Sequence, residues 1–362
     1  MDWDFAMVDN LHTAKLKTSI ISILKGIVFA SLLGLLVLDN LTKPRIMVMH
    51  SYEPSMDIVK DFDGGIKKVL ENEFDLLIQT YYMNMLNKNT IKQKINAGIE
   101  AKASIDRFKP EILVAVGDEA QEFSAKFYLG KKNIRIIFAG VKGDFKKLGY
   151  IPGQNVGGII EVPQVQELNL LINSMFPGKK NIKLAHLGDT SVIVNLTEKI
   201  LVQHVWKNVK FQDSIMVDDS VSFKRAAAFF NKHYDVLLIS SYKGLKDSFD
   251  TDDEIASYET MKWVTENTTI PIISTMGYAI EEGAGAAIVS SAYDQGMLAM
   301  RSALAMLKVP SFFPNITSKV LSVFLNDDHI RARKIFIPSI YRSFAAGIQK
   351  LYGHDAAQEG GL

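Results

Sequence analysis

Cysteine is absent from this sequence of 362 residues, and so is an excess of charge of either sign. Without cysteine the chain has no disulfides, no thiolate nucleophile and no zinc site built on thiolates. Lys and Arg number 41 and Asp and Glu number 40, which leaves a formal net charge of +1. This balance argues against a large basic surface for nucleic acid, so nucleic acid is not an expected partner.

Long disordered or low-complexity tracts are also lacking, and no short repeat interrupts the chain. Hydrophobic residues make up 48% of the sequence and charged residues 22%, an ordinary composition for a folded protein. At about 100–200 residues per domain, the length predicts two domains or one large two-lobed unit.

One apolar segment near the N-terminus stands apart from the rest. Thr18–Leu38 has about 21 residues and a single charge, Lys25, which matches the roughly 20 residues that span a bilayer core. The uninterrupted part, Gly26–Leu38, is also of signal-peptide length. Lys15 and Lys17 precede the segment and favour a cytoplasmic N-terminus. The segment therefore predicts either a membrane anchor or a signal peptide.

A signal peptidase prefers small residues before its cleavage site, and Val37-Leu38-Asp39 provides none. A retained anchor is therefore favoured over cleavage. We expect residues 1–17 in the cytoplasm, residues 18–38 as a single pass through the inner membrane, and the main domain in the periplasm or outside the cell. If the segment is cleaved, the protein is periplasmic.

From Arg45 onward, short apolar strands alternate with helical periods. Repeated β-α-β units of this size predict parallel sheets covered by helices on both faces. The pattern predicts an α/β fold with two doubly wound lobes. Their expected limits are 45–162 with about 279–308 for the N-terminal lobe, 163–278 with about 309–345 for the C-terminal lobe, and 346–362 for a tail.

Several phrases, in this order and spacing, resemble one family. They are Val48–Tyr52 (VMHSY), Ile136–Val141 (IIFAGV), Asn155–Glu161 (NVGGIIE), Met175–Gly178 (MFPG), Asp235–Ser240 (DVLLIS), Ile270–Ser274 (IPIIS), Glu281–Val289 (EEGAGAAIV) and Tyr293–Gly296 (YDQG). Together they resemble the ABC-transporter substrate-binding proteins of type 1 periplasmic-binding-protein fold. His50-Ser51-Tyr52 and the turn at Asp118-Glu119-Ala120 look closest to the variants that serve as extracytoplasmic sensor domains. The resemblance implies a solute-binding protein that clamps a small ligand between two lobes, with an ABC permease or a membrane sensor protein as partner.

In doubly wound sheets, ligands bind beyond the carboxyl ends of the strands. Aromatic rings, hydroxyls and carboxylates at those ends suit a small amphipathic ligand, and an amino-acid-like one fits an acidic pair beside helix N-termini. The same positions also suit helix capping, which is the alternative interpretation of Asp118, Asp189 and Thr190. The candidate ligand-binding residues are Ser51, Tyr52, Tyr82, Asp118, Glu119, Gly140, Asp189, Thr190, Ser241, Tyr242, Met276 and Asp294.

Signatures of catalysis are weak. The seven histidines show no metal-binding spacing, and no phosphate-binding loop follows a predicted strand. We therefore expect a binding protein that is not an enzyme, with no cofactor and no metal. Two alternatives stay open: a hydrolase or isomerase that uses Asp118, Glu119 or Asp189 as acid and base, and a degenerate module that binds a partner protein. The identity of the ligand does not follow from the sequence.

Overall fold

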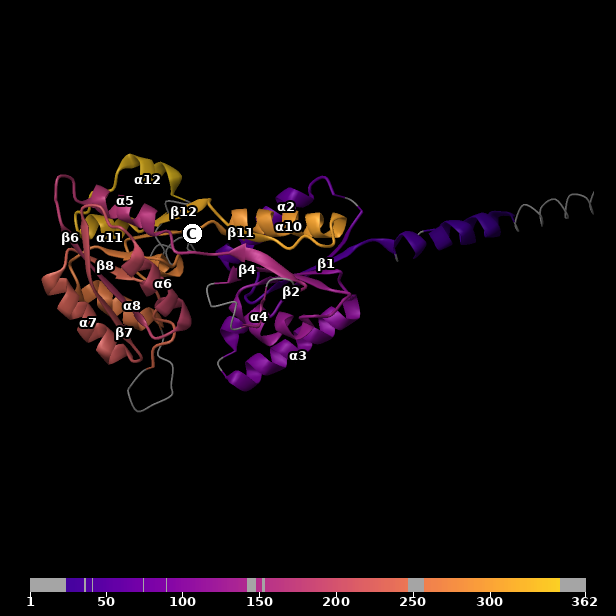
Figure 1. Ribbon diagram of the computed structural model, residues 1–362, viewed down its shortest axis with the longest axis horizontal. Helices are drawn as coiled ribbons and strands as arrows, with labels where there is room; N and C mark the ends of the chain where they lie inside the picture. The colour runs from indigo at the N-terminus through magenta and orange to yellow at the C-terminus, as the bar shows by residue number, and fades with distance from the viewer. Residues whose placement is uncertain are drawn as a thin grey trace, which may run out of the picture.

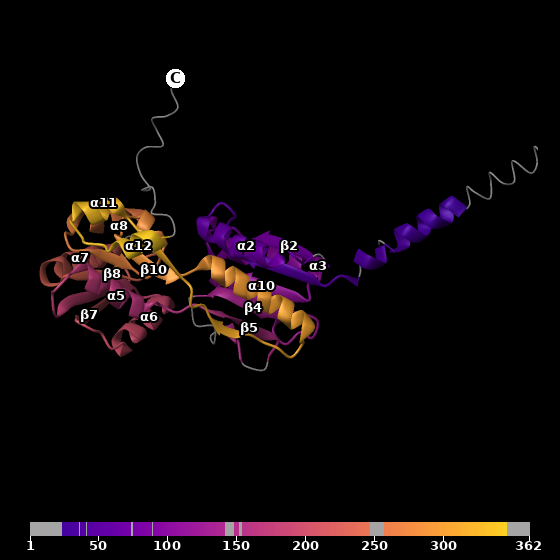
Figure 2. The same ribbon diagram turned by 90° about the horizontal axis from the view of Figure 1, so that it is seen from above.

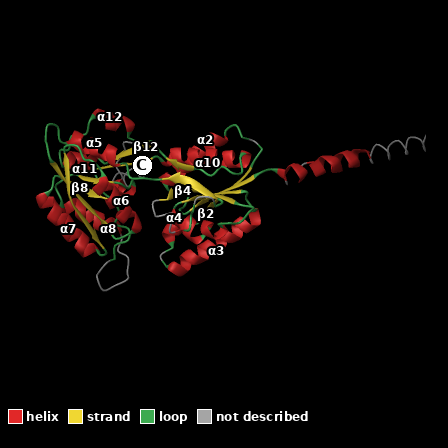
Figure 3. Cartoon of the chain, in the orientation of Figure 1, coloured by secondary structure: helices red, strands yellow, loops and turns green. Residues whose placement is uncertain are grey.

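Two sheets of six strands each build two lobes that lie side by side (Figures 1 and 2). The computed structural model describes residues 24–35, 37–40, 42–73, 75–88, 90–141, 148–151, 154–246 and 257–345. Figure 3 shows that strands and helices alternate through both lobes, as the β-α-β pattern predicts. The α/β class with two mainly parallel sheets is confirmed.

All neighbouring strands of the first sheet are parallel, in the order β11-β5-β4-β3-β1-β2. The strands are β1 (Arg45–His50), β2 (Leu77–Tyr82), β3 (Ile112–Val116), β4 (Arg135–Val141), β5 (Val156–Ile160) and β11 (Asn315–Thr317). The helical segments of this lobe are α2 (Asp57–Leu70), η1 (Met85–Asn87), α3 (Ile91–Phe108), α4 (Asp118–Phe123), η2 (Ala125–Tyr128) and α10 (Ala292–Lys308).

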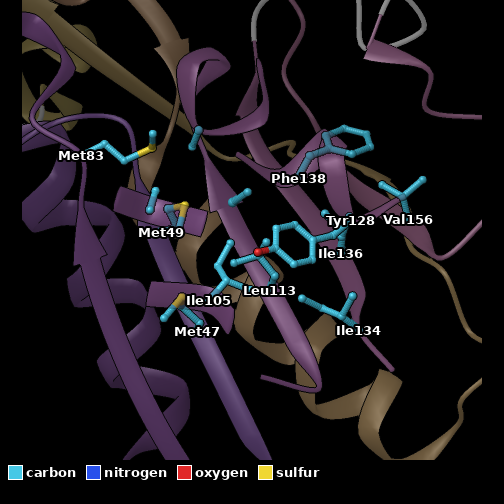
Figure 4. Close-up of a cluster of buried hydrophobic side chains, with 14 of the residues drawn as sticks. Met47, Met49, Met83, Ile105, Leu113, Tyr128, Ile134, Ile136, Phe138 and Val156 are labelled. Carbon is cyan, nitrogen blue, oxygen red and sulfur yellow. The ribbon is translucent and has the colours of Figure 1, made fainter. Parts of the chain in front are cut away.

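Alternate residues of β1 face opposite sides of this sheet, and both sides are buried. Met47 and Met49 pack with Ile105 of α3, whereas Ile46 and Val48 pack in a second cluster with α2 and α10. Figure 4 shows the first of these clusters, where Met47 and Met49 lie close to Ile105. Burial on both faces explains why the strands have near-continuous apolar sequences.

The second sheet has the order β12-β10-β9-β8-β6-β7, with β12 antiparallel to β10 and the other pairs parallel. Its strands are β6 (Ile182–Asp189), β7 (Val209–Val217), β8 (Val236–Ile239), β9 (Ile272–Ser274), β10 (Ala286–Ser290) and β12 (Leu321–Leu325). Its helices are α5 (Val165–Met175), α6 (Val192–Gln203), α7 (Ser220–His233), α8 (Ser257–Asn267), α9 (Tyr278–Glu281), α11 (Asp327–Ala332) and α12 (Ser339–Phe344).

Two glycines allow α2 and α10 to pack at close range over the first sheet. A Cβ atom on Gly65 would lie 2.0 Å from the carbonyl oxygen of Tyr293, and one on Gly296 would lie 2.1 Å from that of Phe62. Both distances are far below contact, so only glycine lets the two helices approach this closely. This contact holds α10 on the first lobe, although β10, which precedes it in the sequence, belongs to the second sheet.

Within the described residues, the chain passes between the two sheets at 161–164, at Ser291 and at 318–320. The expected lobe limits placed residues 279–308 in the N-terminal lobe and 309–345 in the C-terminal lobe. Instead, β10 joins the second sheet and β11 joins the first. The alanine-rich β10 and the three-residue β11 are too short for periodicity to place. The lobe limits themselves remain a prediction.

Side chains cap the N-termini of two long helices. Thr90 caps α3 with a capping box that it forms with Gln93. Asp219 caps α7, and its side chain accepts a hydrogen bond from the backbone N–H of Ser222. The carboxylate accepts this bond because Asp219 keeps an extended backbone before the helix begins.

Residues 24–35 and 37–40 are helical and extend away from both lobes (Figures 1 and 2). Their large apolar side chains are exposed, Phe29 by 70% and Leu35 by 62%. Part of the expected span, residues 18–23 and 36, lies outside the described residues, as do residues 1–17 and the tail. Among the described residues, the search for a helix long and apolar enough to cross a membrane found none.

Candidate ligand-binding site

Ser51, which follows β1, binds the loop after the neighbouring strand β3. Its hydroxyl donates to the carbonyl of Val116 at 3.0 Å and accepts from the N–H of Ala120 at 2.8 Å. Gly117 has a φ of +88°, and a Cβ there would lie 2.5 Å from the Ser51 hydroxyl. Ser51 is almost fully buried, so this candidate residue positions the start of α4.

Tyr52, Asp118 and Glu119 come together at the start of α4. Burial, followed by the charges of Glu119 and Asp118, raises the pKa of Tyr52. Burial also raises the pKa of Glu119. The Oε2 atom of Glu119 is buried and has no hydrogen-bond partner. An acceptor in this state favours a ligand that brings a hydrogen-bond donor.

In the second lobe, Asp189 at the end of β6 binds the loop after the neighbouring strand β8. Its carboxylate accepts from the Ser241 hydroxyl at 2.9 Å and from the N–H groups of Gly244 and Ser191 at 3.0 and 2.9 Å. The Tyr278 hydroxyl donates to Ser241 at 3.3 Å. Asp189 and Ser241 are thus brought together as expected, but their polar atoms bond mainly to each other and to the backbone.

Tyr242 is a core residue with an unusual hydroxyl. It is 1% exposed and packs edge-on against Tyr278, with ring centroids 5.7 Å apart. Its hydroxyl and the Oε2 atom of Glu282 are both buried without a hydrogen-bond partner. Burial first, and then the neighbouring Glu282 charge, raises the pKa of Tyr242. Lys243 pairs with the other oxygen of Glu282 at 2.5 Å and lies 4.9 Å from the centroid of the Tyr278 ring.

Side chains at these strand ends are near enough to interact electrostatically across the two lobes. Tyr278 of the second lobe contributes to the raised pKa of Tyr52 in the first. Burial and then the charge of Asp57, at the start of α2, raise the pKa of Glu281 in α9. We call these surfaces the interlobe face, made of Tyr52, Asp57, Asp118, Glu119, Tyr242, Lys243, Tyr278, Glu281 and Glu282.

Gly140 lies in β4, and Asp294 lies in the first turn of α10, next to the crossover at Ser291. The N–H of Gly140 donates to Gln295 at 3.1 Å, and Asp294 accepts from the Ser318 hydroxyl at 2.8 Å. These bonds join the start of α10 to β4 and to the last crossover. Met276 is buried and lines a small cavity of about 20 Å³ beside the first crossover, a volume that suits about one water molecule.

Two candidates lie in separate networks. The Tyr82 hydroxyl donates to Asp63 at 2.7 Å, and its ring stacks on His50, which also bonds to Asp63 at 2.9 Å. Thr190 is exposed and its hydroxyl bonds to Asp218. The first network fastens α2 to the strand ends β1 and β2, and the second joins the strand ends β6 and β7.

Sequence reasoning missed Lys243, Tyr278, Glu281 and Glu282 as site residues. Tyr278 follows β9 by four residues, and the two glutamates stood inside the phrase EEGAGAAIV, so strand-end position could have indicated them. No group of three or more metal-ligating side chains is found in the part of the chain that the structure describes.

Solved structures of low sequence identity are similar to this two-lobed chain. A conserved domain protein from Vibrio cholerae has 15% identity and a TM-score of 0.56, with 84% of this chain and 99% of that chain covered. A ligand-free, open substrate binding protein with adhesive properties from Clostridium difficile has 19% identity and a TM-score of 0.60, covering 82% and 96%. An ABC domain from Streptococcus pneumoniae, in complex with L-Trp, has 16% identity and a TM-score of 0.56, covering 83% and 99%.

These similarities define the fold class as that of type 1 periplasmic substrate-binding proteins. The family model of the ABC transporter substrate binding protein matches residues 57–343. The chain belongs to this family. A search of curated proteins found no match.

Proposed function

We propose that this chain is an extracytoplasmic substrate-binding protein whose two lobes close on a small amino-acid-like ligand. Membership of the family supports a protein that binds a small molecule and presents it to an ABC permease. A membrane sensor remains the alternative partner. Closure by a hinge at the crossovers requires that the ligand contact the closed form better than the open one.

One observation carries the proposal: Tyr52 of the first lobe interacts electrostatically with Tyr278 of the second and with Glu119, whose Oε2 atom is buried without a hydrogen-bond partner. Aromatic faces from both lobes can enclose an apolar body, and the carboxylate can accept from an ammonium group. The similar chain from Streptococcus pneumoniae is complexed with L-Trp, so amino acids are the first ligands to test.

The test is small-angle scattering of the full chain with and without a mixture of the twenty amino acids. Closure predicts a fall in the radius of gyration, and native mass spectrometry then identifies the bound member. Tyr52→Ala and Tyr278→Ala should each weaken binding by about 1–3 kcal/mol. Tyr258→Ala is the control, since Tyr258 is an exposed tyrosine of α8. Binding without compaction, or full affinity in both site variants, contradicts the clamp.

The enzyme alternative has one feature in its favour, the raised pKa of Glu119, because catalytic acids often show such shifts. Burial is the largest cause of the raised pKa of Glu119. A buried carboxylate that binds the amine of a ligand would show the same shift without any role in catalysis. Turnover of a bound compound that is lost in Glu119→Gln and Asp118→Asn would favour the enzyme.

We also propose that the N-terminal segment anchors the domain to the membrane. Nine large apolar side chains between Leu24 and Leu38 are more than half exposed, and lipid is the environment that suits them. Carbonate extraction of membranes should leave the full-length chain in the pellet, and Leu32→Lys with Leu33→Lys should release it. Intact mass distinguishes a retained anchor from a cleaved signal. A full-length chain in the soluble fraction contradicts the anchor.

A further inference from the structure

The interlobe face has carboxylates from both lobes. The first lobe contributes Glu119 and Asp57, and the second contributes Glu281 and Glu282. Asp57 and Glu281 are close enough for the charge of one to raise the pKa of the other. Closing the lobes brings like charges together, which opposes closure unless a positive group enters between them.

The cations beside Asp57 and Glu282 are already engaged, and the charge of Lys94 acts on Glu119. Lys60 pairs with Asp57 at 2.7 Å, and Lys243 pairs with Glu282 at 2.5 Å while its ammonium lies over the Tyr278 ring. A ligand carboxylate would therefore have to compete with Glu282 for Lys243. A ligand ammonium meets no such competition at the Oε2 atom of Glu119.

A second observation points to the same ligand chemistry. Besides Glu119, the Oε2 atom of Glu282 is buried, and its neighbour there is the hydroxyl of Tyr242, a side chain that is 1% exposed. An unpaired buried polar atom is unfavourable, and the two carboxylate oxygens among these can only accept. An alkylammonium has three N–H donors and no acceptor, whereas a carboxylate offers only acceptors.

The rings of the face suit a cation as well. Tyr52 and Tyr278 are half-buried and lie on opposite lobes, and Lys243 already lies over the faces of Tyr242 and Tyr278 at 5.5 and 4.9 Å. Ammonium groups are attracted to aromatic faces, most strongly where water is excluded. The rings can therefore hold the amine and the apolar body of the same ligand.

We propose that the interlobe face selects a ligand of net positive charge, an amine with an apolar or aromatic body and no carboxylate, over the zwitterionic amino acid. This inference rests on the proposed clamp and specifies its substrate class. The amine donates a hydrogen bond to the Oε2 atom of Glu119 and offsets the repulsion between the two acidic lobes. A free carboxylate would add one more negative charge to the face.

Three compounds that share one phenyl ring test the selection by calorimetry on the full chain. Phenethylamine is phenylalanine without its carboxylate, and 3-phenylpropionate is phenylalanine without its ammonium group. We expect phenethylamine to bind at least about tenfold more tightly than phenylalanine, and 3-phenylpropionate not to bind. Tighter binding of phenylalanine, binding of 3-phenylpropionate, or no binding of phenethylamine overturns the inference.

Glu119→Gln tests the residue while preserving its shape. The variant should reduce the affinity for phenethylamine about tenfold, because its ammonium loses the carboxylate. Phenylalanine should lose less, because removing this negative charge also relieves the repulsion of its own carboxylate, so the preference narrows. Glu122→Gln, an exposed acid of the same helix, is the matched control and should keep the preference. An unchanged preference in Glu119→Gln contradicts the inference.

Scattering separates this inference from the clamp. Compaction with phenylalanine but not with phenethylamine leaves the proposed function standing and rejects the amine preference. Tight binding of phenethylamine without compaction rejects the clamp and keeps the preference.

Discussion

The two lobes repeat one topology and use it with different side chains. The order β2-β1-β3-β4-β5 in the first sheet corresponds to β7-β6-β8-β9-β10 in the second. In each lobe, a polar residue at the end of the first strand binds the loop that follows the next strand of the sheet. In the first lobe it is Ser51, with two hydrogen bonds; in the second it is Asp189, with two bonds to that loop and a third from the adjacent N–H of Ser191. Ser51 and Asp189 therefore have the same structural role, which is to hold the loop after the next strand. The residues beside them differ in the polar groups that are available to a ligand.

The lobes also differ in how they hold histidine. His50 of the first lobe bonds to Asp63, whereas the second lobe buries His186 and His329 without an acid. His186 bonds to two serine hydroxyls, and burial lowers its pKa to about 4. His329 bonds through Nδ1 to the Gly283 carbonyl and accepts at Nε2 from the N–H of Ile272, so its neutral form fits the site. Burial, with Arg333 nearby, lowers the pKa of His329 to about 3.

Acidification gives the largest expected effect. A histidine whose folded pKa lies below its unfolded value of about 6.5 stabilises the fold above that pH, and the contribution falls as the pH drops. Each of His186 and His329 should therefore reduce the free energy of unfolding by about 2 kcal/mol at pH 5. The pKa of Asp63 is lowered instead: burial raises it, but the bonds from His50 and Tyr82 outweigh burial. Its contribution is lost only below about pH 4.

Urea unfolding at pH 7 and pH 5 measures this difference. Trp206 and Trp263 both belong to the second lobe, so their fluorescence follows its unfolding while circular dichroism follows the whole chain. We expect the fluorescence midpoint to fall more than the dichroism midpoint. His186→Gln and His329→Gln should each flatten the pH dependence. Equal midpoints at both pH values would remove the distinction between the lobes.

The second effect concerns the strand-end residues. Asp189→Ala leaves buried donors from Ser191, Ser241 and Gly244 without their acceptor and should destabilise the protein by about 3 kcal/mol. Ser51→Ala removes two bonds of a neutral hydroxyl and should lower stability by about 1–2 kcal/mol. Thermal unfolding of the two variants checks the order. A larger loss for Ser51→Ala would contradict the equivalence of these positions.

The third effect concerns the close packing of α2 on α10 in the first lobe. Gly65→Ala places a Cβ atom 2.0 Å from the Tyr293 carbonyl oxygen and should cost about 2 kcal/mol. Gly64→Ala is the matched control, because its Cβ meets only the Tyr293 ring at 3.5 Å, an ordinary contact. Alanine there should be neutral or stabilising by up to about 1 kcal/mol, since it favours the helix. Equal melting temperatures for the two variants would refute the tight packing of α2 on α10.

Much of the fold follows from local sequence signals. The buried strands β1, β3 and β6 are short apolar runs, and Thr90 begins α3 where its capping pattern indicates. The hydrophobic pattern is enough to predict these strands, because a strand that is buried on both faces of a sheet has a nearly continuous apolar sequence. The strand-end rule also selected Tyr52, Asp118 and Glu119, which the structure brings together.

Tertiary structure decided the rest. Whether a strand-end carboxylate is open to a ligand depends on its neighbours in space: Asp189 is engaged by three donors, and one oxygen of Glu119 by none. The positions of β10 and β11, and the facing of Tyr52 and Tyr278, likewise arise from contacts between residues far apart in the chain. Sequence alone therefore determined the β-α-β units and the apolar N-terminal segment, because these depend on local hydrophobic pattern. Packing determined which polar groups remain available, because hydrogen bonding between distant residues leaves no local pattern.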